Sequence, residues 1–373
     1  MNKKNIILIV VVIAIVGVIF YLDSQKLNVG SGDSQDTTKF VDSTKPAVKN
    51  IDGDEYPLAP ELANIFGYLN TNDKEIKISD YSGKVVLIDF WTYTCINCIR
   101  TLPYLTAWDN KYRDKGLVII GVHAPEFEFE KVKENVMAAI EKYNIEYPVV
   151  QDNDRGTWNA FNNRYWPAKY LIDSDGYIRY THFGEGNYEE TERKIQELIA
   201  EAGNDASGVA LTEETNSIRY ETTPELYAGA VFALPRGQYV GNKKTPVRQE
   251  NYTLPDKLDK RDVIYLDGSW THNSDNLQLD GDSGTIALDF TASEVNIVAA
   301  PLEDAQNVKM EVLIDGKYAT TINAGEDVEF LDGKAFVKID GKRLYQIFKG
   351  SYGEHRLDLK VSKGFSFNAF TFG

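Results

Sequence analysis

The pattern of apolar and polar positions divides the chain into five segments. An uncharged run dominated by Ile and Val covers residues 6–22, and a polar stretch rich in Asp, Ser, Thr, Lys and Gly follows to about residue 60. We therefore predict a membrane anchor over 1–22, a flexible stalk over 23–60, an α/β domain over 61–203, a linker over 204–217 and an all-β sandwich over 218–373.

The α/β domain is predicted from apolar runs that alternate with helical periodicity. Continuously apolar runs at 84–90 and 117–122 indicate buried central strands. Between them, residues 98–115 place Leu102, Leu105, Trp108 and Tyr112 on one helical face. Further helices are expected at 131–143, 157–163 and 188–202, and further strands at 147–151, 169–172 and 177–183, the last two joined by a turn at 173–176.

The C-terminal region has the short, alternating segments that are typical of β-sandwiches. Strands are expected at 263–266, 285–291, 295–298, 308–314, 343–348, 355–361 and 365–372, and Asp-Gly turn signals occur at 267–268, 315–316, 332–333 and 340–341. No residue of this region stands out as a nucleophile, base or metal ligand, so we interpret it as a binding or interaction module.

The charge balance narrows the possible partners. A formal net charge of −16 disfavours binding to nucleic acid or to anionic lipid headgroups. Lys3 and Lys4 precede the apolar run, no small-residue cleavage pattern follows it, and the positive-inside rule then leaves the amino terminus in the cytoplasm. We expect a single-pass membrane protein whose soluble domains face an oxidising, extracytoplasmic compartment.

The chain has two cysteines, Cys95 and Cys98, which lie between a predicted strand and a predicted helix. At a helix N-terminus, free backbone N–H groups and the helix dipole stabilise a thiolate on the first cysteine, and the second can attack the resulting mixed disulfide. A zinc site is disfavoured, because there is no second C-x-x-C and the four histidines are scattered. The spacing therefore indicates a redox-active dithiol that needs no cofactor or metal.

A thiol peroxidase is an alternative. Thr92 precedes Cys95 at a spacing reminiscent of peroxiredoxins, in which a Thr positions the peroxide. However, Ile88 stands where those proteins have a proline, and a cysteine as near as Cys98 fits dithiol exchange better.

Longer runs carry a family resemblance. Asp89 before the dithiol and Trp166-Pro167 before a strand resemble the buried carboxylate and the cis-proline loop of thioredoxins. The runs 91–104, 121–127, 165–173, 182–186 and 369–373 resemble the DipZ family, in which a thioredoxin-like domain precedes a sandwich similar to carbohydrate-binding modules, with a jelly-roll topology.

This resemblance implies roles for individual residues. Asp89 would accept a proton from Cys98, and a cis bond at Pro167 would present the backbone of Trp166 to an extended substrate. His123 and Glu126 follow the second predicted strand, on the side where the active site is expected, so they could line the substrate groove or tune Cys95, and Trp91 is a further candidate for the groove. His123 could instead make a structural hydrogen bond.

The resemblance also implies partners. They are disulfide-containing envelope proteins as substrates and a membrane thiol carrier of the cytochrome c biogenesis type as the source of electrons. A glycan ligand of the sandwich is a further expectation, with Trp270, Tyr345 and Tyr352 as aromatic candidates. The alternative to an enzyme is a surface adhesion or glycan-binding protein in which the thioredoxin fold serves only as a spacer for the sandwich.

Overall fold

The computed structural model describes residues 47–72, 74–214, 220–242 and 249–373. The predicted anchor and the predicted stalk as far as residue 46 lie outside the described residues. Among the residues described, no helix is long and apolar enough to cross a membrane.

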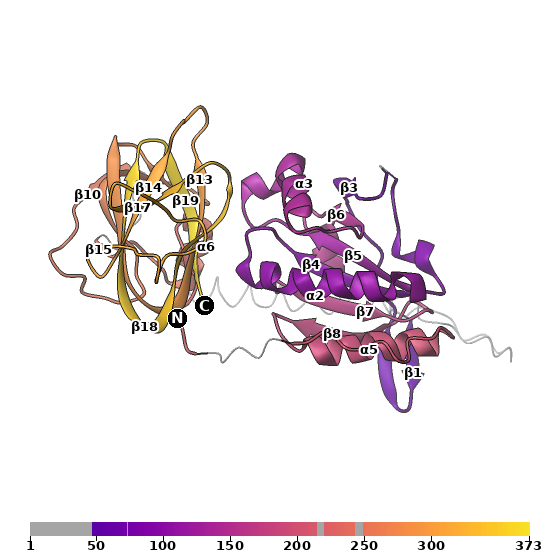
Figure 1. Ribbon diagram of the computed structural model, residues 1–373. Coiled ribbons are helices and arrows are strands. Elements are labelled where there is room, and N and C mark those ends of the chain that lie inside the picture. The colour runs from indigo at the N-terminus through magenta and orange to yellow at the C-terminus, as the bar shows by residue number, and fades with distance from the viewer. Residues whose placement is uncertain (1–46, 73, 215–219, 243–248) are drawn as a thin grey trace, which may run out of the picture. The chain divides into compact units, whose positions relative to one another are not determined.

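The α/β domain is built on a six-stranded sheet in the order β3-β6-β5-β4-β7-β8 (Figure 1). The central strand β4 (Val85–Trp91) pairs in parallel with β5 (Leu117–His123) and antiparallel with β7 (Ala168–Ile172). The outer strands are β6 (Val149–Gln151) and β3 (Gly67–Leu69) on one side and β8 (Ile178–Phe183) on the other. The predicted central strands are thus confirmed.

Both faces of this sheet are covered, which explains why its central strands are continuously apolar. Val85, Leu87 and Trp91 belong to the core beneath the helices α2 (Ile96–Tyr112), α3 (Lys133–Lys142) and α5 (Tyr188–Glu201). Val86, Ile88 and Phe90 of β4 face the opposite core, which includes Trp158 of the short helix α4 (Gly156–Ala160). Short 3-10 turns lie at Ile78–Tyr81, Arg113–Lys115 and Glu128–Lys131.

The C-terminal domain is all-β, as predicted. Within the described residues one eleven-stranded hydrogen-bonded network surrounds one main apolar core. Its strands are β9 (Leu226–Tyr227), β10 (Gln249–Tyr252), β11 (Tyr265–His272), β12 (Leu277–Leu279), β13 (Ser283–Pro301), β14 (Lys309–Ile314), β15 (Lys317–Tyr318), β16 (Glu329–Leu331), β17 (Lys334–Lys338), β18 (Arg343–Ser362) and β19 (Phe365–Phe372). A short helix, α6 (Ala230–Ala233), and a 3-10 turn at Leu234–Arg236 follow β9.

Several details of this domain differ from the prediction. The segments 285–291 and 295–298 are parts of one bulged strand, β13, and β18 likewise joins two predicted strands. Asp267-Gly268 lies inside β11 and is not a turn. The expectation that Trp270 and Tyr345 are exposed for sugar stacking is wrong, because both side chains are fully buried in the core. Tyr352 is partly exposed, but it stacks on Tyr220.

The predicted stalk ends earlier than expected. Residues 48–57 form a hairpin of β1 (Val48–Ile51) and β2 (Asp54–Pro57), and Leu58 makes a β-bridge to Tyr177. The first part of the predicted linker packs against the α/β domain: Ala206 is buried, and the backbone N–H of Thr212 donates a hydrogen bond to the Glu192 carboxylate of α5. Both segments belong to the α/β domain because of long-range polar contacts that no local pattern reveals.

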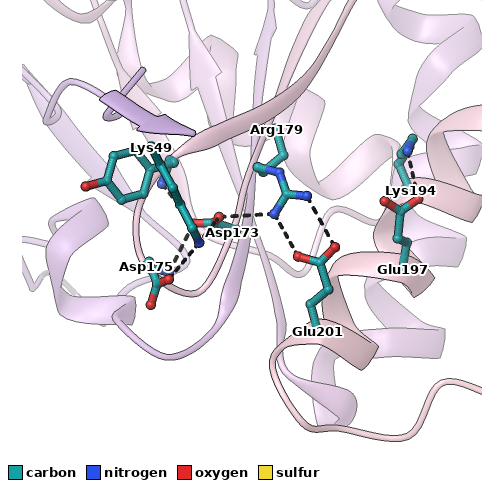
Figure 2. Close-up of polar contacts among 8 residues, drawn as sticks. Lys49, Asp173, Asp175, Arg179, Lys194, Glu197 and Glu201 are labelled. Atoms are coloured by element: carbon teal, nitrogen blue, oxygen red, sulfur yellow. Dashed lines mark hydrogen bonds and ion pairs between the residues drawn. The ribbon is translucent and has the colours of Figure 1, made fainter. Parts of the chain in front are cut away.

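Ion pairs attach the hairpin to the sheet (Figure 2). Lys49 Nζ lies 3.0 Å from Asp173 Oδ2 and 2.7 Å from Asp175 Oδ2. Arg179 of β8 connects Asp173 to Glu201 of α5, at 3.3 and 2.7 Å. Burial alone would raise the pKa of Asp173, but hydrogen bonds from the Tyr177 backbone, Lys49 and Arg179 outweigh it and lower that pKa.

We predict that Asp173→Asn destabilises the α/β domain. The side chain of Asp173 is only 4% exposed and has two cationic partners, so its loss should lower the free energy of unfolding by about 3 kcal/mol, the scale for breaking a buried pair. Glu197→Gln breaks the exposed pair with Lys194 and serves as the matched control, with an expected effect of about 0.3 kcal/mol.

The pH dependence of this difference follows from the lowered pKa. The stabilisation is fully present above the pKa of an unfolded Asp, about 3.9, and is lost as the pH falls through the lower pKa of the folded state. Urea unfolding at neutral and acidic pH measures it. Equal effects of the two substitutions, or a difference that does not shrink in acid, would contradict this role of Asp173.

Candidate active site

The two cysteines occupy different environments at the start of α2. Cys95 is the N-cap residue and is partly exposed, whereas Cys98 is 1% exposed. The backbone N–H of Cys98 donates to Cys95 Sγ at 3.3 Å, the contact expected of an N-cap side chain. The Cys95 sulfur therefore lies at the helix N-terminus, with a backbone N–H directed at it.

Cys98 is a poor thiolate in this resting arrangement. Its burial first, and then its hydrogen bond with Cys95 and the charges of Cys95 and Asp89, raise the pKa of the Cys98 thiol. Both cysteines are free thiols here. A buried thiol of this kind needs a nearby proton acceptor before it can attack a disulfide.

Asp89 lies where such an acceptor is needed. It is fully buried on β4, and the alternation of the strand puts it on the same face as Leu87 and Trp91, beneath α2. Burial raises the pKa of Asp89 to about 7, and the charge of Lys169 acts against this rise. Asp89 and Cys98 are coupled through their charges, so the structure brings together the two groups that the sequence had linked.

The predicted cis peptide between Trp166 and Pro167 is confirmed. The Pro167 carbonyl accepts a hydrogen bond from the N–H of Gly184, which attaches this loop to β8. Trp166 Nε1 donates to the Ala124 carbonyl at 3.0 Å, and the ring of Trp166 packs against the same core as Cys95. The exposed part of Trp166 is available to a substrate, since the residue is only partly buried.

Two of the residues predicted to line the substrate groove lie in the interior instead. Trp91 and His123 are fully buried, and their rings pack edge to face at a centroid distance of 5.2 Å. Burial lowers the pKa of His123 to about 3, so the imidazole is neutral near pH 7 and cannot stabilise a thiolate by charge. The prediction that these two residues line the groove is wrong, because Trp91 packs on His123 and Tyr93 stacks on the His123 ring.

Glu126 and Glu130 shape this loop. The carboxylate of Glu130 accepts hydrogen bonds from the N–H groups of Glu126 and Phe127, at 2.6 and 2.9 Å, and from the hydroxyl of Thr94 at 2.5 Å. Thr94 directly precedes Cys95. Glu130 thus connects the loop to the dithiol. The sequence gives only a weak signal of this role, which is an acidic residue in a short 3-10 turn that begins after Phe127.

Glu126 is bonded to the C-terminal domain. Its carboxylate accepts a hydrogen bond from Tyr227 Oη at 2.7 Å, and burial together with the charges of Glu225 and Glu130 raises the pKa of Glu126 to about 8. In this structure Glu126 contacts Tyr227 of β9, and its contact with a substrate stays a prediction.

The site has no feature of a metal centre. No group of His, Cys, Asp and Glu suitable for a metal ion occurs in residues 47–72, 74–214, 220–242 and 249–373. What the arrangement can do chemically is exchange of disulfides: an accessible thiol, a buried second thiol one helical turn away, and a buried carboxyl of near-neutral pKa.

Two family models match separate parts of the chain. Residues 59–181 match the model of the AhpC/TSA family, and residues 223–373 match that of the thioredoxin-like C-terminal domain. StoA from Bacillus subtilis is among the similar solved structures, with 19% identity and a TM-score of 0.31, over 36% of this chain and 98% of StoA.

Two curated relatives place the chain more closely. Protein DipZ of Mycobacterium tuberculosis is 35% identical over 323 residues, which are 84% of this chain and 43% of DipZ. The thiol-disulfide oxidoreductase YkuV of Bacillus subtilis is 29% identical over 38% of this chain and 94% of YkuV. The chain therefore spans less than half the length of DipZ, but it matches over both of the domains described above. In sequence and in its two domain matches, the chain is similar to DipZ and to proteins of the thioredoxin type.

Proposed function

We propose that the chain is a thiol-disulfide oxidoreductase that reduces disulfides of envelope proteins. The observation that supports this most strongly is the asymmetric dithiol: Cys95 is partly exposed at a helix N-terminus, while Cys98 is buried next to Asp89. YkuV is named for the same activity and aligns over nearly its whole length.

The reaction proceeds in two exchange steps. The Cys95 thiolate attacks a substrate disulfide, a Cys95–substrate S–S bond forms, and the first substrate sulfur leaves as a thiol after taking a proton from solvent. Cys98 then attacks Cys95 Sγ as its proton passes to Asp89. The Cys95–substrate bond breaks, and the second substrate sulfur leaves and is protonated. The products are a substrate dithiol and a Cys95–Cys98 disulfide.

An external reductant must return that disulfide to the dithiol. The proposed donor is a membrane thiol carrier of the cytochrome c biogenesis type, and the proposed anchor at residues 6–22 would hold the soluble domains beside it. The dipeptide Ile96-Asn97 lacks the histidine of strongly oxidising pairs, which supports the reducing direction.

The peroxidase alternative loses its motivating residue. Thr92 is fully buried, and its hydroxyl lies 3.4 Å from His123 Nε2. The Thr92 hydroxyl is thus engaged inside the protein, which supports dithiol exchange over peroxide chemistry. Exchange between dithiol and disulfide is therefore the chemistry that we propose.

Substrate trapping tests the roles of the two cysteines. Cys98→Ser should accumulate covalent adducts with client proteins, because the mixed disulfide on Cys95 can no longer be resolved. Cys95→Ser should form none, since Cys98 is buried. Adducts are counted on non-reducing gels and identified by mass spectrometry. Trapping by Cys95→Ser alone would reverse the assignment.

The direction of electron flow is tested by alkylation in intact cells. Cys95 and Cys98 should be found mainly as thiols and should shift to the disulfide when the membrane carrier is deleted. The Cys95→Ser, Cys98→Ser double variant provides the unreactive reference band. A pair that is oxidised in normal cells, and that depends on an oxidase for that state, would show the opposite direction.

The membrane anchor has its own test. Mass spectrometry of the protein isolated from membranes should recover peptides from residues 6–22, because the proposed anchor is retained. Extraction should require detergent and not high salt. A mature N-terminus near Asp23 would mean that the apolar segment is a cleaved signal.

A further inference from the structure

Lys169 is a buried cation that the exchange chemistry above leaves without a role. It lies on β7, two residues after Pro167, and its side chain is fully buried. Lysine is almost never fully buried unless a charge compensates it. Moreover, Lys169 Nζ has no hydrogen-bond partner in the structure, so ordinary satisfaction of its donors does not explain its burial.

The register of the sheet places Lys169 directly opposite Asp89. The two residues are Cα partners in the antiparallel pairing of β4 with β7. Their side chains share a face, because the neighbours of Lys169 on β7, Ala168 and Tyr170, belong to the opposite core. Lys169 therefore faces the same interior as Asp89 and Cys98.

The other flank of Asp89 offers no cation. Its partner on the parallel strand β5 is Gly121, which has no side chain. A Cβ at Gly121 would lie 3.2 Å from the ring of Tyr147, so that ring occupies the space over the glycine. The Tyr147 hydroxyl is itself buried without a partner, and burial followed by the charge of Asp89 raises the Tyr147 pKa well above its usual value.

The remaining groups around the pair are few. Burial lowers the pKa of Lys169, and the charges of Asp89, Cys98 and Glu185 act against this and favour the cation. His182 is its Cα partner on β8, and the ring of Tyr188 on α5 lies 5.8 Å from Lys169 Nζ. Burial lowers the pKa of His182, so the imidazole adds no positive charge near neutral pH. Lys169 is thus the cation that faces Asp89.

We propose that Lys169 is a positioning residue for the resolving step: its charge keeps Asp89 ionised so that the carboxylate can accept the proton of Cys98. The influence is electrostatic and not a direct hydrogen bond, because Asp89 Oδ1 and Lys169 Nζ both lack hydrogen-bond partners. This inference rests on the proposed function, and it adds a residue from the strand that also carries the substrate loop.

The test is Lys169→Met followed by stopped-flow reaction with Ellman's reagent. Attack by Cys95 releases one thionitrobenzoate and resolution by Cys98 releases the second, so the two steps are seen separately. The first phase should stay within about twofold of wild type. The second phase should become slower at pH 7, because the pH at which its rate is half-maximal should rise. Each pH unit of that rise should lower the rate at pH 7 by about tenfold.

Two further variants separate positioning from a structural effect. In an Asp89→Asn background, Lys169→Met should slow the second phase no further, because its target is gone. Lys194→Met removes the same charge from the exposed face of α5, where Lys194 pairs with Glu197, and should leave both phases unchanged. The proposal would be overturned if the double variant slowed the second phase by the product of the two single effects. It would also be overturned if Lys169→Met slowed both phases equally.

Folding should survive the substitution, because Asp89 can take up a proton and become neutral once its cation is removed. Should Lys169→Met fail to fold, Lys169→Gln offers the same loss of charge with a polar side chain. In whichever variant folds, carbon NMR of the Asp89 carboxyl should give a higher titration midpoint than in wild type. An unchanged midpoint would overturn the inference, whereas adduct formation by Cys98→Ser would still support the proposed function.

Discussion

The burial of Asp89 in the central strand is the constraint on which the active site depends. Every other residue of β4 is apolar, and the alternation of the strand leaves this carboxyl under the helix that carries the dithiol. Buried without hydrogen bonds to Oδ1, the carboxyl retains a proton up to a pKa of about 7. The elements around it provide what this position requires: a lysine on β7, a glycine on β5 and a buried thiol on α2.

The asymmetry of the dithiol follows from where α2 begins. A helix that starts one residue after Cys95 leaves that thiol at the open end, where backbone donors face it, and turns Cys98 inward to the core. One sulfur thereby faces a backbone donor at the helix start, while burial raises the pKa of the other. The same geometry fixes the order of the two exchange steps, because only the outer sulfur can meet a protein disulfide.

The parts that could be predicted from the sequence are those encoded by neighbouring residues. The dithiol, the buried strand that precedes it, the cis-proline loop and the Asp173–Gly176 turn are all local patterns, and the structure has each of them. Trp91 and His123 were misplaced because their burial depends on ring contacts between them and with Tyr93, which their positions in the sequence do not reveal. Lys169 was missed for a similar reason: only the register of β4 with β7 reveals its partner. The hairpin at 48–57 depends on Lys49 and Asp173, which are far apart in the chain.

The near-neutral pKa of Asp89 has a cost in stability as well as a use in catalysis. An unfolded Asp ionises near pH 3.9, whereas the folded Asp89 does so near 7, so the folded state holds the extra proton between these values. Stability is therefore highest below the lower pKa, falls as the pH rises toward 7, and changes no further above it. A base is most effective when its pKa is close to the working pH, since it is then both available and strong enough to take the proton. A cation such as Lys169 limits the rise that burial imposes and keeps Asp89 in that range, where a fully apolar neighbour would leave the carboxyl protonated and the buried thiol without an acceptor.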